Sequence, residues 1–149
     1  MSELKKRLSS IIESPNQNST EKLQKICHLL DQEIPYFNWT GFYFRNGDKE
    51  ELILGPYVGA ETDHTVIPFG KGICGQVAVS GETFVVPNVK EQDNYLSCSI
   101  DTKAEIVVPI IKDGKNIGQI DIDSHQLNPF TDEDREMLEW LTEKVATIL

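Results

Sequence analysis

The sequence predicts an α+β domain in which helices pack against an antiparallel sheet. Two segments with apolar residues at helical spacing open the chain, short apolar runs separated by turns fill its middle, and an amphipathic helix pattern closes it. The 149 residues are 39% hydrophobic and 26% charged, which is enough for one buried core without disulfides or a structural metal. We therefore expect a single domain over residues 1–149.

Two helices are expected before the first strand. The first covers residues 1–13, and the second begins near Asn18, whose side chain can accept hydrogen bonds from the free amides of the first turn. Pro35 marks the end of the second helix, and Cys27 lies on its apolar face, so we interpret Cys27 as a core residue. The closing helix is expected from about Thr131, which provides a hydroxyl cap ahead of three acidic residues.

The middle of the chain predicts two hairpins and two shorter strands. Turns at Asn46-Gly47-Asp48 and Asp113-Gly114 join the strands of the hairpins. A glycine-rich turn over residues 70–75 opens a short helix that ends at Gly81, and residues 87–102 form a long loop without periodicity. The predicted strands cover residues 39–44, 52–54, 66–69, 84–86, 105–110 and 116–123.

Charge and cysteine content limit the partners and the compartment. A net charge of −10 disfavours binding to nucleic acid or to an anionic membrane, because a polyanion is repelled. The sequence has no run of transmembrane length and no apolar N-terminal signal, so we expect a cytoplasmic protein. Its three cysteines are irregularly spaced and are expected to be thiols.

Two of these cysteines are candidates for redox chemistry. Cys98 lies in the long polar loop, where a thiol is accessible, and Cys74 lies at the start of the short helix, where unpaired amides favour a thiolate. The alternatives are an incidental loop cysteine and a small packing residue beside turn glycines. The pattern Gly70-x-Gly72-x-x-Gly75 lacks the βαβ context of a dinucleotide site.

Acidic and aromatic residues are predicted to share one face of the sheet. Asp121 and Asp123 are two residues apart on a strand, and Glu105 opens the neighbouring strand, so their carboxylates need a cation, a metal or shared protons. The alternative is a solvated strand end. Trp39 and Tyr43 also share a strand face and are either core residues or walls of a binding site.

Metal and cofactor sites are not expected. Cys74, Cys98 and one of the histidines could form a zinc site only if the fold brought them together. The sequence offers neither a C-x-x-C nor an H-x-x-x-H element. We therefore predict no metal and no cofactor.

Five segments of the chain resemble the free methionine-R-sulfoxide reductases, a branch of the GAF domain family. They occur in the family's order and span nearly the whole chain. The segments are Trp39-Thr40-Gly41-Phe42-Tyr43, Leu52-Ile53-Leu54-Gly55-Pro56, Ile67-Pro68-Phe69-Gly70-Lys71-Gly72-Ile73-Cys74-Gly75, Glu105-Ile106-Val107-Val108-Pro109 and Asp121-Ile122-Asp123-Ser124.

The resemblance implies a six-stranded antiparallel sheet flanked by helices, an enzyme that is usually dimeric, and free methionine sulfoxide as substrate. Cys98 would then attack the sulfoxide sulfur and become a sulfenic acid, and a thioredoxin-type partner would reduce the resulting disulfide. The family's acidic residues match Glu105, Asp121 and Asp123. Its aromatic pocket residues match Trp39 and Tyr43.

Two departures from the family's pattern keep a second function open. The family has a third cysteine ten residues before the position of Cys74, where this chain has His64, so recycling would use Cys74 or an external thiol. Around the nucleophile, Ser99 replaces an acidic residue, and Tyr95-Leu96-Ser97 replaces the sequence His-Ile-Ala. The alternative is a non-catalytic GAF sensor that binds a small ligand. We prefer the reductase because sensors usually precede an output domain, which we do not expect here.

Overall fold

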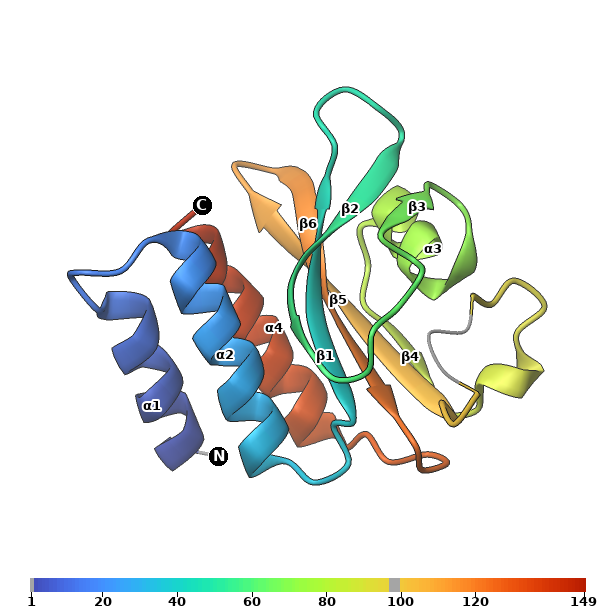
Figure 1. Cartoon of the computed structure of the whole chain (residues 1–149), viewed down its shortest axis with the longest axis horizontal. Coiled ribbons are helices and arrows are strands. Elements are labelled where there is room, and N and C mark those ends of the chain that lie inside the picture. Colours follow the sequence, from blue (N-terminus) through green and yellow to red (C-terminus); the bar gives the residue numbers. More distant parts are fainter. Residues whose placement is uncertain (1, 97–99) are drawn as a thin grey trace.

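A six-stranded antiparallel sheet with helices on both faces forms the centre of the molecule (Figure 1). The structure is a computed structural model, and it describes residues 2–96 and 100–149. The strands lie in the order β3-β2-β1-β6-β5-β4, which confirms the predicted α+β, GAF-like sheet flanked by helices. In chain order the elements are α1 (Ser2–Glu13), α2 (Ser19–Glu33), β1 (Trp39–Arg45), β2 (Glu51–Val58), β3 (Val66–Pro68), α3 (Gly72–Ser80), β4 (Phe84–Val86), the 3-10 helix η1 (Val89–Glu91), β5 (Ala104–Lys112), β6 (Lys115–Ser124) and α4 (Asp132–Ala146).

The sheet separates two layers of different character. Helices α2 and α4, with α1 beside them, cover one face, and α3 covers part of the other (Figure 1). Successive side chains of β6 point to opposite faces of the sheet, so alternate residues of this strand belong to different layers. Ile120 and Ile122 pack in the core beneath the three helices, so Asp121 and Asp123 point to the face of α3.

The larger core lies between the sheet and the three helices. Leu30, Ile106, Ile110 and Leu138 have no exposed surface and belong to one contiguous cluster. Burying each such side chain stabilises the fold by about 1.5–3 kcal/mol. Cys27 is also fully buried in this cluster, which confirms its interpretation as a core residue.

A smaller apolar cluster fixes α3 against the opposite face. Ile73 and Val77 of α3 are buried together with Tyr43, Leu52 and Val107 of the sheet. This packing holds the first turn of α3 over the sheet, on the face to which the β6 carboxylates point.

The predicted helix caps are present. The Asn18 side chain accepts a hydrogen bond from the Glu21 amide at 2.9 Å. Thr131 and Asp134 form a reciprocal capping box at the start of α4, and the Tyr36 hydroxyl donates to Asp134 at 2.7 Å. The box therefore joins the start of α4 to the segment that follows α2.

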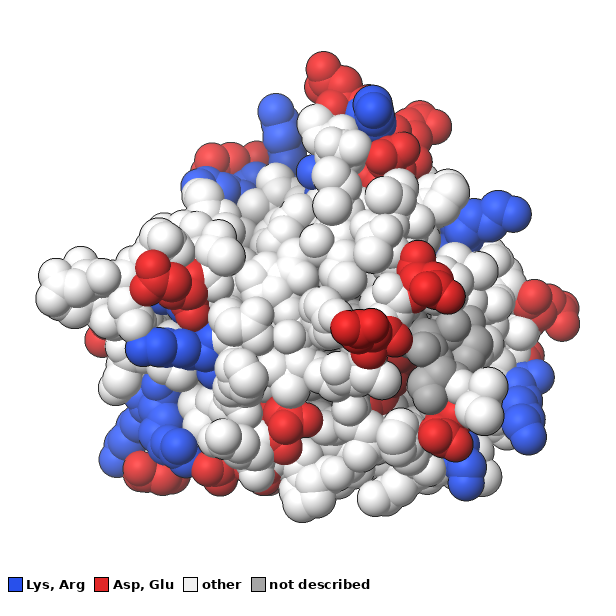
Figure 2. Space-filling view, viewed as in Figure 1, with Lys and Arg blue, Asp and Glu red and all other residues white. Residues whose placement is uncertain are grey.

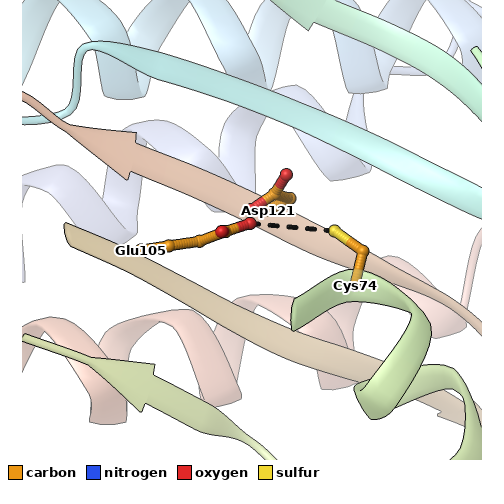
Figure 3. Close-up of side chains that lie close together, drawn as sticks. All are labelled: Cys74, Glu105 and Asp121. Carbon is orange, nitrogen blue, oxygen red and sulfur yellow. Dashed lines mark hydrogen bonds between the residues drawn. The ribbon is translucent and has the colours of Figure 1, made fainter. Parts of the chain in front are cut away.

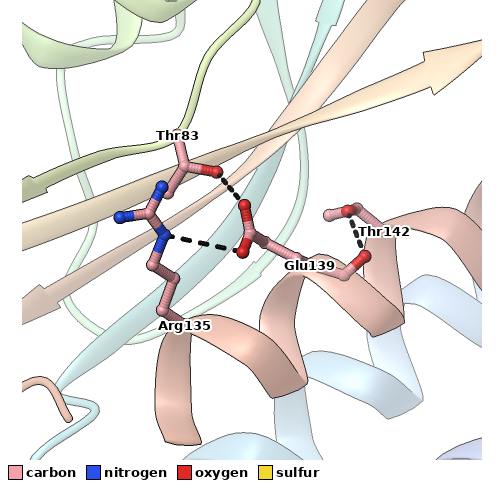
Figure 4. A network of polar contacts seen from close by, with 4 residues as sticks. All are labelled: Thr83, Arg135, Glu139 and Thr142. Atoms are coloured by element: carbon pink, nitrogen blue, oxygen red, sulfur yellow. Dashed lines mark hydrogen bonds and ion pairs between the residues drawn. The ribbon is translucent and has the colours of Figure 1, made fainter. Parts of the chain in front are cut away.

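A polar network attaches α4 to the segment before β4 (Figure 4). Thr83 donates a hydrogen bond to Glu139 at 2.8 Å, and Arg135 forms an ion pair with the same carboxylate at 3.5 Å. A groove of about 570 Å³ lies beside this network. None of the predicted site residues that the structure describes lines this groove.

Two segments differ most from their predicted extents. Strand β2 continues to Val58 because its far end pairs with Thr40 and Gly41 of β1 after a register shift. The predicted loop over residues 87–102 contains the helix η1, whose first turn is capped by the side chain of Asn88. Local hydrophobic periodicity reports neither a bulge nor a single helical turn.

Negative charge is spread over the face of the molecule shown in Figure 2. Acidic side chains are scattered across the face shown in Figure 2, and positive side chains lie mostly around its edge. In residues 2–96 and 100–149, no helix combines the length and apolar character needed to cross a membrane.

Candidate active site

Three carboxyl groups converge on the face of the sheet that α3 covers. Glu105 of β5 pairs with Asp123 of β6, and Asp121 pairs with Gly41 and Val107 in the strands on either side. The exposed fractions are 0% for Asp121, 1% for Asp123 and 4% for Glu105. The alternative of a solvated strand end is therefore wrong.

Cys74 joins two of these carboxyl groups from the first turn of α3. Its side chain is 4% exposed, and its thiol donates to Glu105 Oε2 at 3.9 Å (Figure 3). The Cys74 sulfur and one carboxylate oxygen each from Glu105 and Asp121 all lie within 4.8 Å of one another. The structure thus brings together three residues that the sequence separates widely.

Burial has the largest effect on the pKa of Asp121. It raises the pKa of Asp121 above its ordinary value of 3.8 and outweighs the hydrogen-bonding effects of Glu105 and Cys74, which lower that pKa. No described residue donates a hydrogen bond of normal geometry to either carboxylate oxygen of Asp121. Asp121 therefore keeps its proton at a higher pH than an exposed aspartate.

The cluster lines a small cavity. Its water-accessible volume is about 10 Å³, and His64, Lys71 and Leu96 lie in its wall together with Cys74, Glu105 and Asp121. That volume is about the size of one water molecule. In this conformation, Leu96 packs directly against Gly72 and occupies the space above the start of α3.

The glycine-rich turn is shaped by close backbone packing. A Cβ atom on Gly75 would lie 2.7 Å from the Pro68 carbonyl oxygen, and Gly72 has a φ of 64°, which favours glycine. These glycines let α3 start close to β3, and Cys74 lies between them.

Asn94 connects the long loop to this turn. Its side chain accepts a hydrogen bond from the Gly72 amide at 2.9 Å and donates one to the Gly70 carbonyl at 2.6 Å. Gln76 of α3 donates to the Asn94 carbonyl at 3.0 Å. The described part of the loop is therefore joined to the element that carries Cys74.

The aromatic residues are buried beside the cluster. Trp39 stacks on Tyr43 and Tyr57 with ring centroids 6.3 and 5.5 Å away. The Tyr43 hydroxyl donates to the His64 carbonyl at 2.9 Å, and the Trp39 indole donates to the Ala60 carbonyl at 3.0 Å. Both side chains thus position the segment that carries His64, and neither lines the small cavity. Their role in substrate binding stays a prediction.

Comparisons with known proteins place this arrangement in a family. The sequence profile of the GAF domain matches residues 16–149. The chain is 44% identical over 122 residues to the free methionine-R-sulfoxide reductase of Saccharomyces cerevisiae, covering 80% of this chain and 67% of that protein. The chain belongs to the free methionine-R-sulfoxide reductase branch of the GAF domain family.

Solved structures of this branch have the same fold. The reduced form of fRMsr from Staphylococcus aureus has a TM-score of 0.90 at 37% identity, covering 99% of this chain and 94% of that one. The free methionine-R-sulfoxide reductase from Neisseria meningitidis, solved in complex with its substrate, has a TM-score of 0.88 at 33% identity. That match covers 95% of this chain and 83% of the other.

Several predicted reductase residues do not lie together in the described cavity. Asp123 shares the face of Glu105 and Asp121 but is not in the cavity wall. Cys98, the predicted nucleophile, lies outside the described residues together with Ser97 and Ser99, so its role stays a prediction. Cys27 is remote from the cluster, and burial raises the pKa of its thiol strongly, which makes it inert.

Lys71 and Asn94 lie at or beside the site of this reductase-family chain, but the sequence did not predict them as site residues. Lys71 is the only charged residue in the glycine-rich turn, which is a usable signal for a residue beside a site. Asn94 gives no local signal, because its partners lie 22 and 24 residues earlier in the chain.

Proposed function

We propose that this protein reduces free methionine-R-sulfoxide to methionine, acting as a single GAF domain over residues 1–149. One observation carries the proposal: two buried carboxyl groups, Glu105 and Asp121, lie beside Cys74 in the wall of a cavity, and burial raises the pKa of Asp121. A sulfoxide oxygen needs a proton before it can leave sulfur, and a buried carboxylic acid is a suitable donor. The family membership of the chain supports the same reaction.

In the proposed reaction, Cys98 is the nucleophile. Its thiolate attacks the sulfoxide sulfur and forms an S–S bond, and the oxygen accepts one proton from the acidic cluster. The resulting hydroxyl moves to the Cys98 sulfur as the S–O and S–S bonds to methionine break, so Cys98 becomes a sulfenic acid and methionine leaves. A second thiol, from Cys74 or from an external molecule, then attacks the sulfenic sulfur, so that water leaves and a disulfide forms. A thioredoxin-type dithiol supplies the two electrons that restore the cysteine.

The charges around the cavity suit a free amino acid. Asp121, Glu105 and Lys71 all line the cavity, so carboxyl and ammonium groups of the protein are both available to a zwitterion. Because the cavity has only about 10 Å³ of water-accessible volume, substrate binding requires the Leu96 side chain to move away from Gly72.

The decisive assay measures methionine released from each diastereomer of free methionine sulfoxide, with thioredoxin and its reductase or with dithiothreitol. We expect turnover of the R form, and we expect Cys98→Ser to abolish it. Cys27→Ala is the matched control because it removes a buried core thiol, which donates a hydrogen bond to the Pro56 carbonyl at 3.6 Å. Unchanged turnover in Cys98→Ser would rule out the assigned nucleophile.

A second assay tests the acid. Asp121→Asn preserves size but cannot release a proton, and general acid catalysis contributes about 10²–10⁴-fold to a rate. We expect kcat to fall by at least about 100-fold while the variant still unfolds cooperatively. A variant with wild-type kcat would exclude Asp121 as the donor.

The alternative is a non-catalytic GAF sensor, which the replacement of the family's third cysteine by His64 favours. A sensor would bind free methionine sulfoxide, seen by calorimetry, and release no methionine. An enzyme without the third cysteine would instead release one equivalent of methionine when no reductant is added.

A further inference from the structure

Cys74, Glu105 and Asp121 have the chemistry of a metal-binding group. A thiolate sulfur and carboxylate oxygens are ligands of zinc, and these three ligand atoms lie within 4.8 Å of one another from three separate elements, α3, β5 and β6 (Figure 3). In a tetrahedral zinc site a sulfur and an oxygen ligand are roughly 3.6 Å apart. Movements of about an ångström would therefore bring the three atoms to coordination distance.

Asp121 provides an independent indication that a cation fits here. Its side chain is fully buried and lines the cavity, and no described residue donates a hydrogen bond of normal geometry to either of its oxygens. A buried carboxylate in this position needs a proton or a cation. The cavity of about 10 Å³ has room for an ion or a single water molecule and is too small for an organic molecule in this conformation.

We propose that Cys74, Glu105 and Asp121 bind a thiophilic divalent cation, with Zn²⁺ as the reference ion, and that occupancy blocks the site. The thiolate selects against Mg²⁺ and Ca²⁺, which prefer oxygen ligands alone. The bound ion occupies the Cys74 sulfur and the carboxyl groups that would donate protons. The inhibitory part of the inference, unlike the binding itself, rests on the proposed reductase function.

The binding test uses the full chain after dialysis against EDTA and needs no turnover. Zn²⁺ is titrated in competition with a chromophoric chelator. Co²⁺ is titrated as a substitute whose bond to a thiolate gives a charge-transfer band. We expect one equivalent of Zn²⁺ per chain and a cobalt–thiolate band, with no competition from Mg²⁺ or Ca²⁺. Absence of Zn²⁺ binding, or equal binding of Mg²⁺, would overturn the proposal.

Variants of the ligands assign the site. Cys74→Ser should remove the cobalt–thiolate band, and Glu105→Gln and Asp121→Asn should each weaken Zn²⁺ binding by about 10-fold or more. Cys27→Ala should keep the band, because that thiol is buried among core side chains away from the cavity. Thermal melts confirm that each variant is folded. A band that survives Cys74→Ser, or wild-type affinity in both carboxyl variants, would contradict the assignment.

Inhibition is measured separately. A single-turnover assay without added thiol avoids chelation of zinc by dithiols, and we expect Zn²⁺ to suppress methionine release and EDTA to restore it. If the protein binds Zn²⁺ at these residues but reduces no sulfoxide, the metal site is supported and the reductase proposal is rejected. An active reductase that neither binds Zn²⁺ nor loses activity with it would reject the metal site alone.

Discussion

Asp121 is an ionisable side chain with no exposed surface, and it lies next to a second carboxyl group and a thiol. In water, its charged form would be favoured at neutral pH. In the sheet, burial disfavours that form and raises its pKa, so the folded protein binds a proton that the unfolded chain has already released. The same residue can thus serve as an acid and also weaken the fold as the pH rises.

The effect of Asp121 on stability is testable with Asp121→Asn. The folded-state pKa is raised, so the stabilising contribution of Asp121 is complete below its ordinary pKa of 3.8 and is lost as the pH rises through the raised value. Asparagine has no such dependence. We therefore expect the Tm of Asp121→Asn relative to the wild type to increase with pH above 3.8.

Asp113→Asn is the matched control, because Asp113 is exposed in the turn between β5 and β6 and has a φ of 51° that asparagine tolerates. Its Tm difference from the wild type should not follow pH in this way. A Tm difference for Asp121→Asn that is constant from acid to neutral pH would show that the buried carboxyl group is not linked to folding.

Among the elements, α3 and the loop after β4 depend on each other. Asn94 bonds to both ends of the Gly70–Gly72 turn, and Gln76 of α3 bonds back to the Asn94 carbonyl. These contacts join the start of α3, with Cys74, to the loop whose sequence includes Cys98. Polar contacts of Asn94 therefore help to hold the two elements of the site together.

We predict that Asn94→Ala lowers kcat/KM by about 10-fold or more, since two hydrogen bonds of about 1 kcal/mol each are lost between the loop and the turn. Asn88→Ala is the control. Asn88 lies in the same loop, and its side chain accepts a hydrogen bond from the Lys90 amide at 3.1 Å. Kinetics with methionine-R-sulfoxide compare the two variants. Equal losses in both would show that the Asn94 contacts do not position the site.

At the start of α4, the capping box also joins two elements. Asp134 is buried and accepts hydrogen bonds from the Thr131 amide at 2.9 Å and from the Tyr36 hydroxyl at 2.7 Å. We predict that Asp134→Ala lowers the free energy of unfolding by about 1–3 kcal/mol, because it removes a cap and leaves the partly buried Tyr36 hydroxyl without its acceptor.

Asp132 lies in the same turn and is exposed, so Asp132→Ala should change the free energy of unfolding by no more than about 0.5 kcal/mol. Urea denaturation measures both variants. If the two substitutions destabilise equally, the effect arises from the helix dipole and not from the capping box.

In the whole molecule, the sheet lies between the larger apolar core and the candidate active site. One face is covered by three helices and holds the larger apolar core, and the other holds the buried carboxyl groups and Cys74. Substitutions in the site can therefore change activity with limited effect on the larger core. This division follows from strand alternation, because β5 and β6 direct apolar residues such as Ile106 and Ile122 to the larger core and the carboxyl groups of Glu105, Asp121 and Asp123 to the opposite face.

The oligomeric state is a prediction for the whole molecule. We expect a homodimer, as in the family that the chain resembles, with a mass of twice the chain's 16.8 kDa. Size-exclusion chromatography with light scattering across a concentration series measures it. A mass of 16.8 kDa at every concentration would exclude the homodimer.

Local sequence patterns predicted most of the elements and the faces of their strands and helices. Helix caps at Asn18 and Thr131, the two hairpins and the shared face of Asp121 and Asp123 depend on neighbours a few residues away, so local patterns predicted them correctly. Cys27 was also placed correctly, because its helix stripe faces the core.

The contacts of the carboxyl groups depend on how distant parts of the chain pack together. Glu105 meets Cys74 from a position 31 residues away, and Asn94 meets the glycine turn across 22 and 24 residues. Residue spacing in the sequence does not predict such contacts, because they depend on how α3 packs across strands that are distant in the chain. The same packing excludes water from Asp121, and burial of that kind, which gives the carboxyl group its raised pKa, is a property of the assembled fold.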